Sequence, residues 1–283
     1  MLSDNNTDGN SQATRKKARE RVENPRKHGH PPYRVAVAHG GPGALGSVGP
    51  VARELSSVCG TLEPFQTAET LDKQVTELEL ILNNAASAPV TLIGHSWGAW
   101  LCTIVAAAQP GLVSKLIIVG SGPFESHYAE QIMPTRLARI APAERERCGS
   151  LMRELHASNH EDKRDVVARL GDLLGRTDDF DPLPPEPDPD GLEADLSVFA
   201  GLFEEADALR RSGELLEIAS RVRCPVVAIH GDYDPHPAEG VVDPLTGVVA
   251  DFRFVLLSRC GHHPWNERWA RDEFFEVVKS EVA

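Results

Sequence analysis

The stretch TLIGHSWGAW, residues 91–100, decides the fold, because an apolar strand runs here into Gly-x-Ser-x-Gly and then directly into a helical pattern. A serine hydroxyl that attacks a carbonyl must stand clear of the backbone on a tight turn, and only glycine lets the neighbouring chain pass so close. Gly94 and Gly98 are the expected spacers, with Ser96 between them. The pentapeptide alone occurs by chance, but the strand before it and the helix after it predict a nucleophile elbow.

Length and charge limit the architecture and the partners. A chain of 283 residues with 41% hydrophobic residues is long enough for one α/β domain, with or without an insertion. The formal charge is −13, and residues 31–283 hold 22 Lys and Arg against 38 Asp and Glu. This excess of negative charge repels phosphate backbones, which argues against nucleic-acid binding by residues 31–283. We expect the basic run 15–19 to be a solvated tail.

The five cysteines are odd in number, scattered and without a Cys-x-x-Cys pair. This pattern predicts reduced thiols, a cytoplasmic location and no zinc site. Residues 1–10 are polar, unlike a signal peptide, and no stretch approaches the roughly 18 apolar residues of a membrane span. We therefore expect a soluble protein that does not bind membranes; its oligomeric state is left open.

Residues 1–30 carry almost no large apolar side chain, so we expect them to be a disordered extension. Order is expected from the apolar run 33–38, which breaks abruptly at His39-Gly40-Gly41-Pro42-Gly43. This glycine-rich loop is either an ordinary turn or a loop that directs backbone N–H groups at a developing negative charge.

The rest of the chain alternates strand and helix patterns, except in one long segment. Further strands are expected at 90–93, 115–120, 225–230 and 252–257, with a short edge strand or loop at 60–65. Helices are expected at 51–55, 71–82 and 99–108 and around 274–278. The alternation predicts a mostly parallel sheet flanked by helices, with the active groups at the carboxyl ends of its strands.

Residues 124–223 lack strand signals and form the expected insertion, after the strand that ends near Gly120. Helical patterns occupy 133–140, 143–155, 165–174, 192–209 and 215–222. The proline-rich segment 181–189 can be neither helix nor central strand. We therefore expect a core of residues 31–123 and 224–283, and a helical cap of residues 124–223.

A base and an acid for Ser96 are expected after the last two strands. A hydroxyl is a weak nucleophile at neutral pH, so it needs an imidazole, and the imidazole needs a third group to fix its tautomer. His262 follows one strand, and Asp232 and Asp234 follow the strand before it. The chain order Ser, Asp, His fits such a sheet. Asp232 and His263 remain alternatives to Asp234 and His262.

With these motifs the chain resembles the α/β-hydrolases with a helical cap, over residues 33–283. The family's Gly-x-Ser-x-Gly, Gly-x-x-Asp and Gly-His-x-Pro-x-x-Glu match residues 94–98, 231–234 and 261–267. The resemblance implies Ser96 as nucleophile, Asp234 as acid and His262 as base. It further implies an oxyanion hole from the backbone amides of Gly41 and Trp97, with no metal and no organic cofactor.

Other side chains near these motifs have alternative roles. Trp265 either lines the pocket or packs in the core. His39 and His95 are expected to orient loops, and His236 is expected in a surface loop. The cap acids Glu204 and Glu205 either form a solvated face or bind the amine of a substrate.

The combination of His-Gly-Gly-Pro-Gly with Ser-Trp-Gly is similar to the prolyl-aminopeptidase branch, in which cap acids hold a free amino terminus. We expect a serine hydrolase that cleaves a small carboxylic ester or amide through an acyl-enzyme, with a small molecule or short peptide as substrate. A prolyl-type aminopeptidase, a carbon–carbon bond hydrolase and a non-enzymatic ligand sensor are the alternatives. Epoxide and haloalkane hydrolysis are disfavoured because they use a carboxylate nucleophile, whereas residue 96 is serine.

Overall fold

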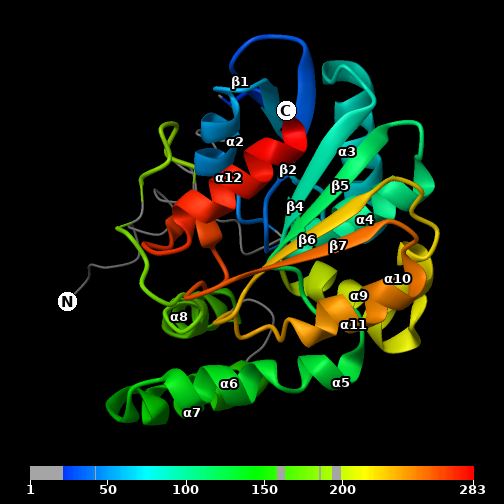
Figure 1. Cartoon of the computed structure of the whole chain (residues 1–283). Helices are drawn as coiled ribbons and strands as arrows, with labels where there is room; N and C mark the ends of the chain where they lie inside the picture. Colours follow the sequence, from blue (N-terminus) through cyan, green and yellow to red (C-terminus); the bar gives the residue numbers. More distant parts are fainter. Residues whose placement is uncertain (1–21, 42, 158–162, 185, 193–198) are drawn as a thin grey trace, which may run out of the picture.

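A single sheet organises the computed structural model, which describes residues 22–41, 43–157, 163–184, 186–192 and 199–283. Its strand order is β1-β3-β2-β4-β5-β6-β7, and among the strands of these residues only the pair β1 and β3 is antiparallel. Figure 1 shows β4, β5, β6 and β7 side by side. The strands are β1 (Arg26–His28), β2 (Tyr33–Ala38), β3 (Gly60–Glu63), β4 (Val90–His95), β5 (Val113–Val119), β6 (Val226–Gly231) and β7 (Phe252–Leu257). The predicted mostly parallel sheet is thus confirmed.

Helices cover both faces of this sheet because successive strand residues point to opposite sides. Ala36, Leu92 and Ile118 pack with one set of helices, whereas Val37 and Ile93 pack with the other. The first set is α3 (Leu71–Ala85), α4 (Trp97–Ala108) and α11 (Glu239–Val248). The second is α2 (Gly49–Leu55) and α12 (Arg271–Val282). The apolar strands buried on both faces are those expected of a parallel sheet.

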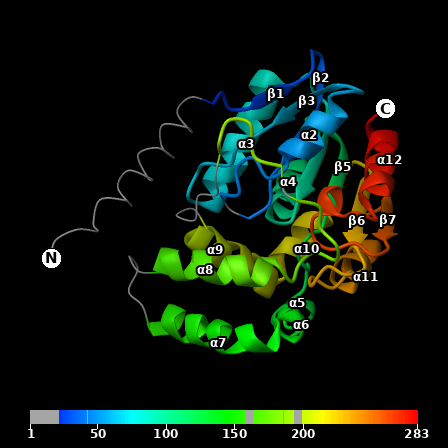
Figure 2. The same cartoon turned by 90° about the vertical axis from the view of Figure 1, so that its left-hand side faces the viewer.

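The described part of the predicted cap is helical. It contains α5 (Ser126–Ala129), α6 (Ile132–Arg139), α7 (Pro142–Ala157), α8 (Lys163–Gly175), α9 (Phe199–Ser212) and α10 (Glu214–Ala219). Helices α6 and α7 lie at the opposite end of the molecule from β1 (Figures 1 and 2). Helix α9 instead packs on the core, since Leu202 and Ala206 join the same apolar cluster as Trp100. Residues 193–198 of the helix predicted at 192–209 lie outside the described residues.

The prediction of a disordered extension over residues 1–30 is wrong at its carboxyl end. Residues 26–28 form β1, which pairs with β3. The reason is polar rather than apolar: Arg26 and His28 both contact Glu63, whose side chain is 0% exposed. The Asn24 side chain also hydrogen-bonds the backbone N–H and carbonyl of Phe65 at 2.9 Å. Residues 1–21, including the basic run 15–19, lie outside the described residues.

Two further expectations concern cysteine and membranes. All five cysteines are unpaired. Within the described residues, no helix combines the length and the apolar character needed to cross a bilayer.

Candidate active site

Ser96 occupies the tight turn between β4 and α4. Its backbone has φ 53° and ψ −115°, a conformation that a residue with a side chain rarely adopts. A Cβ on Gly94 would lie 2.2 Å from the carbonyl oxygen of Gly98, and one on Gly98 would lie 2.5 Å from that of His39. Both positions therefore need glycine, as the sequence predicted.

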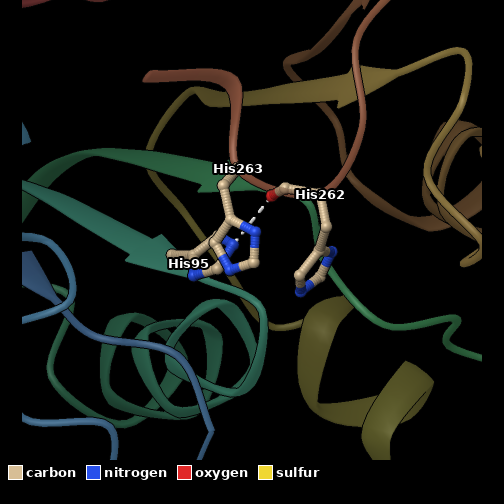
Figure 3. Close-up of side chains that lie close together, drawn as sticks. All are labelled: His95, His262 and His263. Carbon is tan, nitrogen blue, oxygen red and sulfur yellow. Dashed lines mark hydrogen bonds between the residues drawn. The ribbon is translucent and has the colours of Figure 1, made fainter. Parts of the chain in front are cut away.

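Asp234 and His262 meet at the carboxyl ends of β6 and β7. The Nδ1 of His262 donates to Oδ2 of Asp234 at 2.7 Å, and both side chains are buried. Because Nδ1 carries this proton, Nε2 is the ring nitrogen left to accept another. The carbonyl oxygen of His262 accepts a 2.9 Å hydrogen bond from Nε2 of His95, the residue before Ser96 (Figure 3). The loop that carries His262 is thus fixed beside the turn that carries Ser96.

The surroundings favour a charged Asp234 and a neutral His262. Burial opposes ionisation of Asp234, but His262, His236 and His230 together outweigh it and hold its pKa well below the usual range. Burial is also the largest influence on His262 and lowers its pKa below the ordinary value, although Asp234 acts in the opposite direction. An imidazole with a lowered pKa is ready to accept a proton at neutral pH.

The two alternative residues lie in other contacts. Asp232 is exposed and accepts hydrogen bonds from the Ser258 hydroxyl at 3.1 Å and the Cys260 backbone N–H at 3.2 Å. The Nδ1 of His263 lies 3.0 Å from Oδ1 of Asp179, which raises the pKa of His263 against the opposing effect of burial. The structure therefore places Asp234, and not Asp232, against His262.

His236 is not the surface-loop residue expected from its two flanking prolines. Its side chain is 14% exposed, and its Nδ1 donates to Oδ1 of Asp234 at 2.7 Å. The flanking prolines suggested an exposed turn, but the backbone N–H and the ring of His236 both bond to the buried Asp234. The spacing Asp-Pro-His was the only sequence signal for this contact.

The glycine-rich loop passes directly over the Ser96 turn. A Cβ on Gly40 would lie 3.0 Å from Cβ of Ser96, and Gly41 adopts φ +35°. His39 is fully buried; its Nε2 accepts the backbone N–H of Gln66 at 3.0 Å, and its Nδ1 lies 2.9 Å from the Gly40 carbonyl oxygen. His39 therefore orients this loop, as expected. Pro42 lies outside the described residues.

The tryptophans surround the site at different depths. Trp97 begins α4 and donates its indole N–H to Gln74 at 3.0 Å. Trp265 is 2% exposed and packs edge-on against the ring of His95, with 4.7 Å between ring centroids. Of the two roles considered for Trp265, the structure shows packing beneath His95.

The cap acids Glu204 and Glu205 are exposed on α9. The carboxylate of Glu205 accepts the backbone N–H of Leu71 at 2.7 Å, the first residue of α3. This contact satisfies one of the free N–H groups at a helix start. Glu205 thus already has a partner in the protein.

Another acid, Glu267, connects residues 180–181 to the loop that carries His262. Glu267 is 0% exposed, and its Oε1 accepts the backbone N–H groups of Phe180 and Gly261, both at 2.6 Å. Its Oε2 accepts the N–H of Asp181 at 2.8 Å. The segment around residue 180 therefore runs beside the loop of His262, which the sequence did not predict.

Among the residues that the structure describes, two groups of side chains have the spacing that a metal ion would need. They are His95, His262 and His263, and Asp234, His236 and His262, with ligand atoms within 4.8 Å of one another. In the second group, the hydrogen bonds from the two histidines to Asp234 account for the spacing. In the first, the rings turn toward one another (Figure 3), and each has one nitrogen within hydrogen-bonding distance of a protein oxygen.

Several solved structures of other proteins share this fold. The crystal structure of VinJ has a TM-score of 0.66 and 18% identity, covering 92% of this chain and 95% of that one. A proline iminopeptidase from Mycobacterium smegmatis has a TM-score of 0.57 and 18% identity, covering 90% and 91%. An enol-lactonase from Burkholderia xenovorans LB400 has a TM-score of 0.57 and 16% identity, covering 90% and 94%. Identities this low establish a shared fold and no shared substrate.

Among curated proteins, no sequence matches the chain. The sequence profile of the alpha/beta hydrolase family, however, matches residues 21–276, which is most of the chain. Together with the parallel sheet and the turn at Ser96, this match shows that the protein belongs to the alpha/beta hydrolase family and that hydrolysis is its class of activity.

Proposed function

We propose that the protein is a serine hydrolase that cleaves a small carboxylic ester or amide, and that esters are the preferred class. The observation that carries this proposal is the buried 2.7 Å hydrogen bond between His262 and Asp234, beside the strained turn of Ser96. In this proposal Ser96 is the nucleophile, His262 the general base and Asp234 the group that fixes the imidazole.

The chemistry takes two steps. Nε2 of His262 removes the hydroxyl proton as the Ser96 oxygen bonds to the substrate carbonyl carbon. His262 then returns this proton to the leaving group as the bond between the carbonyl carbon and that group breaks, which leaves an acyl-enzyme. Water, deprotonated by the same nitrogen, then adds to the acyl carbon. As the bond between this carbon and the Ser96 oxygen breaks, His262 gives the proton to that oxygen and the acid is released. Asp234 stays ionised and stabilises the imidazolium in both steps.

Backbone N–H groups from two elements are suited to stabilise the oxyanion. Trp97 is the first residue of α4, so its N–H belongs to those that a helix leaves free at its positive end. Gly41 lies in the loop that passes over Ser96, with φ +35°. We assign these two N–H groups to the oxyanion hole. Each such donor contributes about 100-fold to 1,000-fold in rate.

The partners of three acids, which include Glu205 but not Glu204 of the two cap acids, favour a neutral substrate over a peptide with a free amino terminus. An amine site needs a carboxylate that is free to bind it. Asp178 forms an ion pair with Arg136 at 2.7 Å, and Asp179 contacts His263. Glu205 accepts the N–H of Leu71. Among the described residues, these acids therefore have partners already, which supports esters over aminoacyl substrates.

A fluorophosphonate probe and two chromogenic substrates test the proposal. We expect the probe to label the wild-type protein at Ser96 and to leave the Ser96→Ala variant unlabelled. We further expect turnover of p-nitrophenyl acetate that exceeds turnover of proline p-nitroanilide. Absence of labelling in folded protein would refute the serine mechanism and favour a ligand sensor. Turnover of the anilide alone would instead favour an aminopeptidase, and labelling without ester or anilide turnover would direct attention to carbon–carbon bond hydrolysis.

A further inference from the structure

The carboxylate of Asp234 contacts a second imidazole, that of His236, besides the imidazole of His262. Its Oδ2 accepts from His262, whereas its Oδ1 accepts both the backbone N–H of His236 at 2.9 Å and Nδ1 of His236 at 2.7 Å. The Asp234 side chain is 0% exposed. With no exposed surface, the carboxylate depends on protein donors, and His236 supplies two of them.

His236 is itself held in place from three sides. Pro235 and Pro237 flank it and restrict the backbone on both sides. His230, on β6 and 1% exposed, donates from Nε2 to the carbonyl oxygen of His236 at 2.8 Å. Since a carbonyl oxygen only accepts, His230 carries its proton on Nε2. The backbone of His236 is therefore held by a residue of the sheet, and its ring is held by Asp234.

The two imidazoles on Asp234 lie close enough to affect each other's charge. Their centroids are 4.6 Å apart, with 31° between the ring planes. Both have Nδ1 directed at the same carboxylate, so two cationic rings would share a single negative charge. Three other titratable side chains contact Asp234 or His262: His230, His95 and His263. The last of these is paired with Asp179.

We propose that His236 is a positioning residue for His262. His236 holds Oδ1 of Asp234 and, through this shared carboxylate, limits the positive charge that His262 takes up. The inference rests on the proposed function of His262 as general base. Burial is the main influence that lowers the pKa of His262, and His236 acts in the same direction, against Asp234. Removal of His236 therefore raises the pKa of His262.

The test compares two substitutions at His236 with one at a distant histidine. His236→Ala removes both the ring and its hydrogen bond, whereas His236→Asn keeps a side-chain N–H donor without a titratable ring. The control is His127→Asn, at an exposed residue of α5. The measurement is the pH profile of kcat/KM for p-nitrophenyl acetate.

We expect the acidic limb of this profile to move to higher pH in both His236 variants and to stay in place in His127→Asn. We also expect kcat at the plateau to fall by about tenfold in His236→Ala, the loss expected for one hydrogen bond to a charged group. His236→Asn should recover most of kcat but keep the shifted limb. A purely structural role would lower kcat without moving the limb.

Unchanged acidic limbs in both variants would overturn the proposal. A histidine NMR titration separates this outcome from failure of the proposed function, because it follows the His262 ring without a substrate. If the wild-type protein neither turns over the ester nor reacts with a fluorophosphonate, the serine mechanism fails. The titration then decides the role of His236: a higher His262 pKa in His236→Asn supports it, and an unchanged one refutes it.

Discussion

Gly40 shows how closely the chain packs around the nucleophile. A Cβ at this position would lie 2.6 Å from Nδ1 of His95 and 3.0 Å from Cβ of Ser96. The ring of His95 is buried between Trp265 and the His262 loop, so it has little room to move. Residue 40 thus tolerates only hydrogen in this direction.

We predict that Gly40→Ala lowers kcat/KM for p-nitrophenyl acetate by about 100-fold and destabilises the fold by about 1–3 kcal/mol, the usual range for overpacking. The matched control is Gly111→Ala, because no atom lies within 4 Å of a Cβ built on Gly111. Ester turnover and urea denaturation measure the two effects. Wild-type turnover in Gly40→Ala would contradict the close approach of this loop to Ser96.

His95 makes stability depend on pH. Burial is the largest influence that holds its pKa well below the ordinary value, and its buried Nδ1 has no hydrogen-bond partner within the described part of the chain. The unfolded chain binds a proton at this histidine below about pH 6.5, whereas the folded protein does not. The free energy of unfolding therefore falls as the pH drops below that value, by at most about 1.4 kcal/mol per pH unit for one proton.

We expect this dependence to weaken in His95→Gln, which removes the titrating group. The measurement is urea denaturation of both proteins between pH 7.5 and pH 5, with the slope of the unfolding free energy against pH as the readout. His262 also has a lowered pKa, but it is present in both proteins. Equal slopes would show that His95 is protonated in the fold.

At the scale of elements, the hydrophobic pattern of a segment decides whether its secondary structure can be predicted from the sequence. Strands β4, β5 and β6 are buried on both faces, so their apolar runs stood out, and the residues that follow them fell at one edge of the sheet. The hydrophobic pattern did not predict strand β1, because this strand is held by polar contacts of Arg26 and His28 with Glu63. His236 escaped notice for a similar reason: its contact with Asp234 depends on the fold of the loop.

Glu267 connects two elements that sequence pattern treats separately. Its carboxylate accepts the backbone N–H groups of Phe180, Asp181 and Gly261 in the buried interior. We predict that Glu267→Ala lowers the free energy of unfolding by about 3 kcal/mol or more, because three backbone N–H groups lose an acceptor that is itself fully buried. Glu267→Gln keeps one acceptor oxygen, and its loss should be smaller. The exposed Glu276 of α12 gives the control, with a change within about 0.5 kcal/mol on substitution by Ala. Equal stabilities of the Glu267 and Glu276 variants would contradict the assigned role.

At the scale of the whole molecule, the segment predicted as a cap, residues 124–223, contacts the rest of the chain at points far from its two chain connections. Arg26 of β1 donates to both oxygens of Asp188 at 2.9 Å, across 162 residues of sequence. Arg53 of α2 donates at 3.1 Å to Glu186, which lies with Asp188 in the proline-rich segment 181–189. The proline-rich segment thus lies against the amino-terminal part of the core, where neither periodicity nor motif could place it.

These two ion pairs differ in burial, and their energies should differ accordingly. The side chains of Arg26 and Asp188 are 10% and 9% exposed, whereas those of Arg53 and Glu186 are 36% and 59% exposed. An exposed pair contributes little because water and salt screen it, while a buried pair with two parallel hydrogen bonds leaves a costly unpaired charge when one partner is removed. We predict a coupling free energy above about 1 kcal/mol in the double-mutant cycle of Arg26→Gln and Asp188→Asn, and below about 0.5 kcal/mol in that of Arg53→Gln and Glu186→Gln. Urea denaturation of seven proteins, the wild type and three variants for each pair, measures both cycles. Similar coupling in the two cycles would show that the proline-rich segment is not fixed to the core at Arg26.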